Sequence, residues 1–284
     1  MAQVSAWAAE RPRLIGLAYR ITGTGSDAED LVQEAYARLS AATQVQDPAA
    51  WLTTVTARLA IDHLRSARVR RETYVGPWLP EPFGDPCDGP EEEAIMAESI
   101  STAMMVVMET MSPLERAAFV LHDVFGYSHD QVAGMLQRTP ASVRQTTRRA
   151  RRHVEARRPR FEVDQSRRRA VGQQFLAAAE GMDLEGLLAL MSPDVVFRSD
   201  GGGVVQAARR EVRGPERVVR FLAGLADKVP GARLLPAWMN ASPAIRLLNG
   251  NGALIGVMTV QVGPEGHVTE LNLVVNPEKL AATD

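Results

Sequence analysis

Arginine is concentrated in one short stretch of this chain, between residues 142 and 152. Arg144 and Gln145 lie four and three residues before Arg148, so a helix would bring them near one face. Arginine can bond guanine through two hydrogen bonds, glutamine can do so with adenine, and further arginines suit phosphates. The chemistry expected here is DNA binding. The candidate residues are Ser142, Arg144, Gln145, Arg148, Arg149 and Arg152.

Two short helices are predicted to position these side chains. Ser128 and Gln131 have the spacing of a capping box, which favours a helix start at this point. Thr139 and Pro140 suit the N-cap and the first position of a second helix. A tight connection between two such helices is typical of a helix-turn-helix, whose second helix enters the major groove. The alternative is a solvated basic face without a partner.

Further helix starts are predicted on the N-terminal side. Ser112 with Glu115 forms another capping box, and so does Ser26 with Glu29. Residues 1 to about 71 are expected to be entirely helical, because apolar residues recur there at helical spacing. The third of these helices ends in a second basic cluster, which the helix dipole alone would favour. That cluster contains Arg65, Arg68, Arg70 and Arg71.

Composition limits the class of protein. The chain has 284 residues and a formal net charge of −2, so two or three domains are expected and a general polycation is excluded. Eleven arginines lie between residues 141 and 169, which confines the basic surface to one part. Cys87 is the single cysteine, so an internal disulfide and a cysteine-based zinc site are excluded. No apolar run approaches membrane-spanning length, and a cytoplasmic protein without a membrane partner is expected.

Prolines dominate the segment from 73 to 98, which predicts an extended linker. Trp78, Leu79 and Phe83 are unusual for a simple spacer, because apolar side chains on a polar linker usually dock somewhere. Local packing on a neighbouring domain and a regulatory contact both explain them.

The remaining residues, about 161–284, change in character. Helical patterns come first, a strand signal includes Val204 and Val205, and the tail is rich in strands. Hairpin signals at 249–252 and 263–266 separate the last strands. This order predicts an α+β domain in which a curved, antiparallel sheet wraps a helix.

Two segments together resemble a known family. Residues 27–34 and 51–65 resemble the promoter-melting domain of extracytoplasmic-function (ECF) sigma factors of the sigma-70 family, and 112–154 resembles that family's helix-turn-helix domain. The resemblance implies a transcription initiation factor that binds core RNA polymerase and directs it to promoter DNA. It further implies polymerase contacts at Asp27, Asp30, Leu31 and Glu34, and DNA contacts at Arg58, Arg65 and Arg68. A solvated acidic face is the alternative for the first set.

The linker and the C-terminal part resemble the sigma-J-type subgroup, which carries a fused SnoaL-like domain of the NTF2 superfamily. That resemblance implies a cone with an internal pocket, which offers a place for a small ligand, and a regulatory role for the domain. The expected regulatory contacts are Trp78, Leu79, Pro80, Asp200, Gly201, Gly202, Asn276, Pro277, Lys279 and Leu280. Glu278 stands where the subgroup commonly has Asp.

The expected fold is therefore multidomain, with two all-α domains followed by an α+β cone. The expected divisions are a region 2 domain (1–72), a linker (73–98), a region 4 helix-turn-helix domain (99–158) and a SnoaL-like domain (161–284). No cofactor, metal or catalytic residue is expected, although Asp200 and Glu270 are the first carboxylates to suspect. Two alternatives stay open: a ligand-responsive DNA-binding regulator acting without polymerase, and a small-ketone cyclase or isomerase fused to a DNA-binding module.

Overall fold

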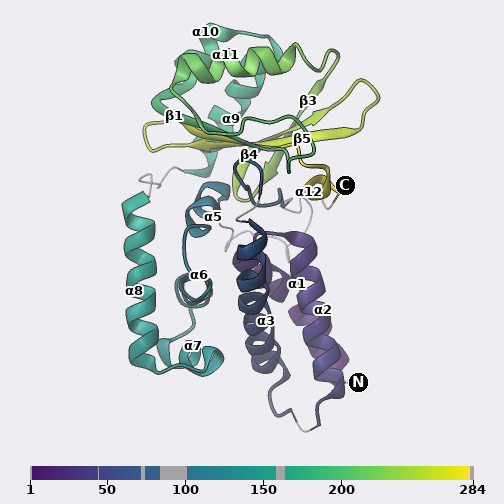
Figure 1. The fold of residues 1–284 in the computed structure, drawn as a ribbon, viewed down its shortest axis with the longest axis vertical. Helices are drawn as coiled ribbons and strands as arrows, with labels where there is room; N and C mark the ends of the chain where they lie inside the picture. Colours follow the sequence, from purple (N-terminus) through teal and green to yellow (C-terminus); the bar gives the residue numbers. More distant parts are fainter. Residues whose placement is uncertain (1, 44, 72–73, 84–100, 158–163, 282–284) are drawn as a thin grey trace. The chain divides into compact units, whose positions relative to one another are not determined.

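The computed structural model describes residues 2–43, 45–71, 74–83, 101–157 and 164–281 (Figure 1). Cys87 lies outside these residues. The chain divides into two compact units. The first contains Met1–Thr73, Asp88–Ser99 and Met104–Arg157. The second contains Tyr74–Cys87, Ile100–Ala103 and Arg158–Asp284, so the start of the linker belongs to the C-terminal unit.

Three long helices begin the first unit. They are α1 (Ala2–Thr22), α2 (Gly25–Ala41) and α3 (Pro48–Arg71). Each packs against the other two, and fully buried side chains fill the space between them. These include Leu14, Leu17, Val32, Leu39 and Leu52. The all-helical prediction for this segment is confirmed.

The start of α2 differs from its prediction. Thr24 is the N-cap, its side chain makes no capping bond, and the helix begins at Gly25. The expected capping box at Ser26 is therefore wrong, because Ser26 already lies inside the helix. Gly23 adopts a φ of 82°, which lets the chain turn directly after α1.

The helix-turn-helix is present in the same unit. Its elements are α5 (Thr102–Met108), α6 (Pro113–Phe119), the π-helical turn η1 (Val120–Val124), α7 (His129–Leu136) and α8 (Pro140–Arg157). Both predicted capping boxes, at Ser112 and Ser128, are formed. Gln137 takes a left-handed φ of 53° and ends α7, so the chain can turn sharply into α8.

The second unit is an α+β domain. Its helices α9 (Gln165–Glu180), α10 (Leu184–Leu190) and α11 (Pro215–Ala226) lie over one face of a six-stranded sheet (Figure 1). The strands are β1 (Met191–Asp200), β2 (Val212–Arg213), β3 (Arg233–Met239), β4 (Ser242–Leu248), β5 (Leu254–Val262) and β6 (Val268–Val274), in the order β2-β1-β6-β5-β4-β3. A one-turn helix, α12 (Pro277–Leu280), follows β6.

The core of this unit lies between the helices and the sheet. Phe175 on α9, Phe197 on β1 and Val218 on α11 are fully buried there. Strands β3 to β6 form the expected antiparallel series, whereas β1 pairs with β6 in parallel. The expected fold class is confirmed, and the parallel pair was not foreseen.

The strand signal at Val204 and Val205 is wrong. Both backbone N–H groups donate to the carbonyl oxygen of Gly201, at 3.0 Å each, so this segment is a turn. Gly202 and Gly203 both have positive φ, which ends any extended run before the valines. Within the described residues, every helix falls short of what crossing a bilayer requires.

Candidate nucleic-acid interface and linker clasp

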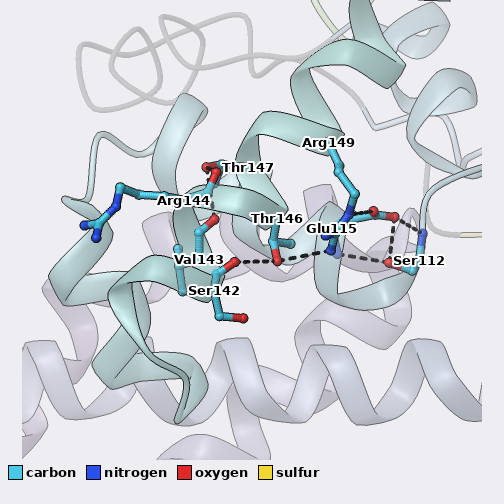
Figure 2. Close-up of polar contacts among 8 residues, drawn as sticks. All are labelled: Ser112, Glu115, Ser142, Val143, Arg144, Thr146, Thr147 and Arg149. Carbon is cyan, nitrogen blue, oxygen red and sulfur yellow. Dashed lines mark hydrogen bonds and ion pairs between the residues drawn. The ribbon is translucent and has the colours of Figure 1, made fainter.

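The predicted DNA-reading side chains lie on the outer face of α8. Arg144, Gln145, Arg148 and Arg152 are exposed, and Ser142 is half-buried. The carbonyl oxygen of Ser142 accepts a hydrogen bond from Thr146 Oγ1 at 2.9 Å. Arg144 points away from the polar group around Glu115 (Figure 2). The outer face therefore presents cations and one amide, as contact with base edges and phosphates requires.

Arg149 is placed differently from its neighbours. Its Nε donates to Glu115 Oε1 at 2.9 Å, and Glu115 also closes the capping box with Ser112 (Figure 2). Burial alone would raise the pKa of Glu115, but the bonds from Ser112 and Arg149 hold it below its ordinary value. Arg151 similarly bonds Asp123 at 2.6 Å. In this conformation both arginines brace α8 against the preceding elements.

Two histidines meet where the helix-turn-helix elements join. The rings of His122 and His129 lie 3.9 Å apart, and His129 Nε2 is 3.2 Å from Thr147 Oγ1 on α8. Burial, and then the nearby positive charges of His122, Arg144 and Arg151, lower the pKa of His129. The neutral form of this ring is therefore favoured in the folded unit.

Arginines also connect the N-terminal helices to the helix-turn-helix within the first unit. Arg13 donates to Thr53 at 2.6 Å and to the Tyr127 hydroxyl at 2.9 Å. Arg116 is 2% exposed and donates to the carbonyl oxygen of Arg20 at 3.1 Å. The bonds to Tyr127 and to Arg20 join parts of the chain 114 and 96 residues apart.

The three DNA-contact candidates on α3 have different surroundings. Arg58 is half-buried and donates to carbonyl oxygens of α7, at 2.7 Å to Met135 and 3.2 Å to Gly134. Arg65 is exposed and bonds Asp62 at 2.9 Å. Arg68 belongs to α3, but its side chain lies outside the described residues. Among the three, Arg65 is the side chain that the described structure places in solvent.

The expected polymerase-docking residues do not form one uniform face. Asp30 and Glu34 are exposed on α2, and Glu34 pairs with Arg38 one turn later. Asp27 is half-buried, with Oδ2 3.1 Å from His63 Nε2. Leu31 is 8% exposed and packs into the helical core. Asp30 and Glu34 are thus the members that a partner can reach in this conformation.

The expected regulatory residues meet at a buried carboxylate in the second unit. Asp200 is fully buried at the end of β1, and its side chain accepts four hydrogen bonds. They come from the Tyr74 hydroxyl at 2.5 Å, the Leu79 N–H at 2.8 Å, the Gly202 N–H at 3.0 Å and Lys279 Nζ at 2.7 Å. We call this group, centred on Asp200, the linker clasp, because two of its four donors belong to the linker.

Lys279 completes the clasp from the C-terminal side. It is 6% exposed, pairs with Asp200, and also donates to the Leu79 carbonyl oxygen. Its Nζ lies 3.9 Å from the centroid of the Trp78 ring, which is a cation–π arrangement. Leu79, Pro80 and Leu280 are buried around it. A buried ammonium is therefore satisfied by a carboxylate, a carbonyl oxygen and an aromatic face.

The small residues after Asp200 make this geometry fit. A Cβ on Gly201 would lie 2.2 Å from the Val205 carbonyl oxygen, and a Cβ on Gly202 would lie 2.5 Å from the Asn276 side chain. Asn276 caps α12, which begins at Pro277, by accepting from the Glu278 N–H at 3.1 Å. Gly201 therefore permits the tight turn after β1, and Gly202 permits close contact between that turn and Asn276 at the start of α12.

Sequence reasoning missed Tyr74. It contributes the shortest bond to Asp200, and its hydroxyl also accepts from Asn276 Nδ2 at 3.2 Å. Burial, and then the hydrogen bond and charge of Asp200, raise the pKa of this phenol. The sequence signal that could have identified Tyr74 is its position at the start of the proline-rich segment.

The second unit also encloses an apolar cavity of about 560 Å³. Phe175, Leu187, Leu222 and Met258 are among its walls, and Glu180 and Arg233 supply charged groups. Neither carboxylate first suspected of catalysis lines it, because Asp200 is in the clasp and Glu270 pairs with Arg198 at 3.0 Å. The described residues contain no group of three metal-ligating side chains. The cavity is suited to holding an apolar molecule.

Comparison with known proteins assigns both helical parts of the chain to protein families. The sigma-70 region 2 family matches residues 7–70, and the sigma-70 region 4 family matches residues 101–154. The chain is 40% identical to the ECF RNA polymerase sigma factor SigJ of Mycobacterium tuberculosis, over 99% of this chain and 94% of that protein. It is 32% identical to the probable ECF RNA polymerase sigma factor SigI of the same species, over 97% and 94%.

A solved structure extends the likeness to the whole chain. The crystal structure of M. tuberculosis SigJ matches with a TM-score of 0.79 and 35% identity, over 98% of both chains. In this chain helical domains come first and a mixed sheet follows, in agreement with the expected order of two all-α domains and an α+β domain. Because two family matches occur in order and relatives at 40% and 32% identity span nearly its full length, this chain belongs to the extracytoplasmic-function sigma factors of RNA polymerase.

Proposed function

We propose that this sigma factor carries its own regulator, and that the linker clasp is the point at which the C-terminal domain acts. The observation that carries the proposal is Asp200, a fully buried carboxylate with two hydrogen bonds from the linker and an ion pair from the C-terminal helix. The clasped residues belong to the segment that joins region 2 to region 4. Opening or closing the clasp therefore changes where the two DNA-contact domains can be placed.

The interactions in the clasp are strong enough to define two states, one with the clasp closed and one with it open. Removing one partner of a buried ion pair typically costs about 3–5 kcal/mol, so the closed form is well defined. A ligand or partner that stabilises one state by a few kcal/mol would shift the balance between them. The apolar cavity belongs to the same domain, and we propose that a small, largely apolar ligand occupies it and biases the clasp.

Residue roles follow the same proposal. Asp30 and Glu34 contact core polymerase directly. Asp27 and Leu31 hold α2 in place through their contacts inside the first unit. Arg144, Gln145 and Arg148 read promoter bases, while Arg152 and Arg65 contact phosphates. The division into residues 1–72, 73–98, 99–158 and 161–284 is retained for these functions. We further propose a cytoplasmic site of action, where polymerase and DNA are found, and no catalytic activity.

The test is transcription in vitro with core polymerase. Tyr74→Phe removes one donor to Asp200 while it keeps the ring, and Glu185→Gln alters an exposed carboxylate on α10 as the matched control. We expect Tyr74→Phe to change RNA output from a given promoter severalfold at unchanged affinity for core polymerase. Equal output from Tyr74→Phe, Glu185→Gln and the parent chain would refute regulation through the clasp.

The role of α2 is tested separately. Asp30→Arg reverses an exposed charge on the proposed docking helix, and we expect loss of core polymerase in a pull-down. Gln33→Arg changes an exposed residue of the same helix and serves as the control. Undiminished capture of polymerase by Asp30→Arg would remove this residue from the interface.

A further inference from the structure

Helix α11 has a basic face directed to solvent. Arg217, Arg220, Gly224 and Lys228 follow at steps of three, four and four, which aligns them along one side of the helix and its C-terminal extension. All three cations are exposed. Val218, on the other side, is fully buried in the core. The core therefore fixes which side of α11 the cations occupy.

These cations border a groove of about 370 Å³. Val212, Phe221 and Leu225 form its apolar part, and Arg217, Arg220 and Lys228 line it as well. Phe221 is held by Phe197, with ring centroids 4.9 Å apart. A Cβ on Gly224 would meet nothing within 4 Å, so this position leaves the groove open. The apolar part of the groove is thus held in place by the core, while the long basic side chains stay in solvent.

The groove keeps an excess of positive charge, because Arg217, Arg220 and Lys228 outnumber the exposed carboxylates beside them, Glu216 and Asp227. Within the described residues, no hydrogen bond or ion pair engages these three cations. Glu211 nearby is already engaged by Arg198 and Arg213. That engagement outweighs burial and lowers the pKa of Glu211. Two further arginines, Arg209 and Arg210, are exposed just before β2 and add to the field.

We propose that this groove, defined by Arg217, Arg220 and Lys228, binds the phosphate backbone of duplex DNA as a third, sequence-independent contact. The inference rests on the proposed function, since promoter binding brings duplex DNA to this chain. From Arg217 to Lys228 the helical rise spans roughly 16 Å, which is long enough to follow several successive phosphates. Guanidinium groups pair well with phosphate oxygens, and such contacts carry no base preference.

The experiment measures the salt dependence of binding to a duplex of random sequence, with the full chain. Arg217→Ser with Arg220→Ser removes two groove cations. Arg167→Ser with Arg169→Ser removes two exposed cations of α9 in the same unit and is the matched control. Each phosphate contact contributes about 0.9 to the slope of log K against log salt, so we expect the groove pair to lower the slope by about 2. The control pair should leave it nearly unchanged.

Equal slopes for the two pairs, or for the groove pair and the parent chain, would overturn the proposal. If inorganic pyrophosphate binds the parent chain and not the groove pair, while the DNA slope is unchanged, the groove is a small-anion site and the proposal is wrong. Transcription with core polymerase at low salt is measured in parallel. A parent chain that initiates no RNA would refute the proposed function. The comparison of salt slopes on random DNA does not depend on transcription, so it would still test the groove.

Discussion

Arg58 Nε donates to the carbonyl oxygen of Met135 at 2.7 Å, and so joins α3 to the last turn of α7. The same guanidinium reaches the Gly134 carbonyl oxygen at 3.2 Å. Carbonyl groups at a helix C-terminus lack partners inside the helix and carry partial negative charge, so a cation is favoured there. These two bonds engage Nε and Nη2 of Arg58 within the first unit.

The first prediction concerns this contact. Arg58→Ala should loosen α7, because charge-assisted hydrogen bonds are lost from its final turn. Because Arg58 is partly exposed, we expect the free energy of opening α7 to fall by only about 1 kcal/mol, which corresponds to about fivefold faster amide exchange. Hydrogen exchange of α7 amides in the full chain measures it, with Arg65→Ala as the control on the same helix. Identical exchange in the two variants would mean that the Arg58 contact does not stabilise α7.

The clasp predicts strong coupling between its two charges. Asp200→Asn and Lys279→Met should each destabilise the second unit by about 3–5 kcal/mol, because each leaves a buried charge without its partner. The double variant should cost clearly less than the sum, since neither charge is then left alone. Denaturant unfolding measures the cycle, followed by tryptophan fluorescence in a chain with Trp7 and Trp51 replaced by Phe, so that Trp78 and Trp238 of the second unit give the signal. Additive losses would show that the two side chains act independently.

Substitutions at the neighbouring residues Arg148 and Arg149 are expected to affect promoter affinity differently. Arg148→Ala should weaken binding to the matched promoter by about 1–3 kcal/mol if its guanidinium reads a base, and mismatched sites should lose less. Arg149→Ala should affect all sequences similarly, since Arg149 is tied to Glu115. Affinities for matched and mismatched duplexes at fixed salt measure both. A uniform loss for Arg148→Ala, with a salt slope smaller by about 1, would assign it to phosphate instead.

Acid should destabilise the helix-turn-helix through His129. The pKa of this ring is lowered in the folded unit from its ordinary 6.5, so the unfolded state binds the proton more readily. The stabilising contribution is therefore complete above pH 6.5 and is lost as pH falls through the lower, folded value. Amide exchange of α7 and α8 between pH 8 and pH 5.5, corrected for intrinsic rates, should reveal this loss. His129→Gln should flatten the profile, and an unchanged profile would contradict the assignment.

Local signals predicted the helical parts well. At Ser112 and Ser128, serine and the acceptor three residues later bond each other reciprocally, as their spacing requires. The same spacing at Ser26 failed, because the chain turns at Gly23, which has a positive φ, and the helix starts two residues earlier, with Thr24 as its N-cap.

The sheet and the clasp depend on long-range contacts, and sequence patterns predicted them less well. Strand β3 was not foreseen, since Pro236 interrupts its pattern and it forms as the edge strand beside β4. Val204 and Val205 have strand propensity, yet the turn at Gly201 takes their N–H groups. Asp200 and Lys279 were expected as regulatory contacts through the family resemblance alone, because 79 residues separate them along the chain, whereas Trp78 was also singled out as an apolar side chain on the linker.

In the proposed regulation, the clasp governs the placement of the two DNA-contact domains. Single-molecule energy transfer tests it most directly, with labels on cysteines at the exposed positions Gln33 and Glu155 and with Cys87 replaced by Ser. We expect a broader distribution of transfer efficiencies for the full chain with Tyr74→Phe than for the parent chain, and no change with Glu185→Gln. Superimposable distributions for Tyr74→Phe and the parent chain would contradict it.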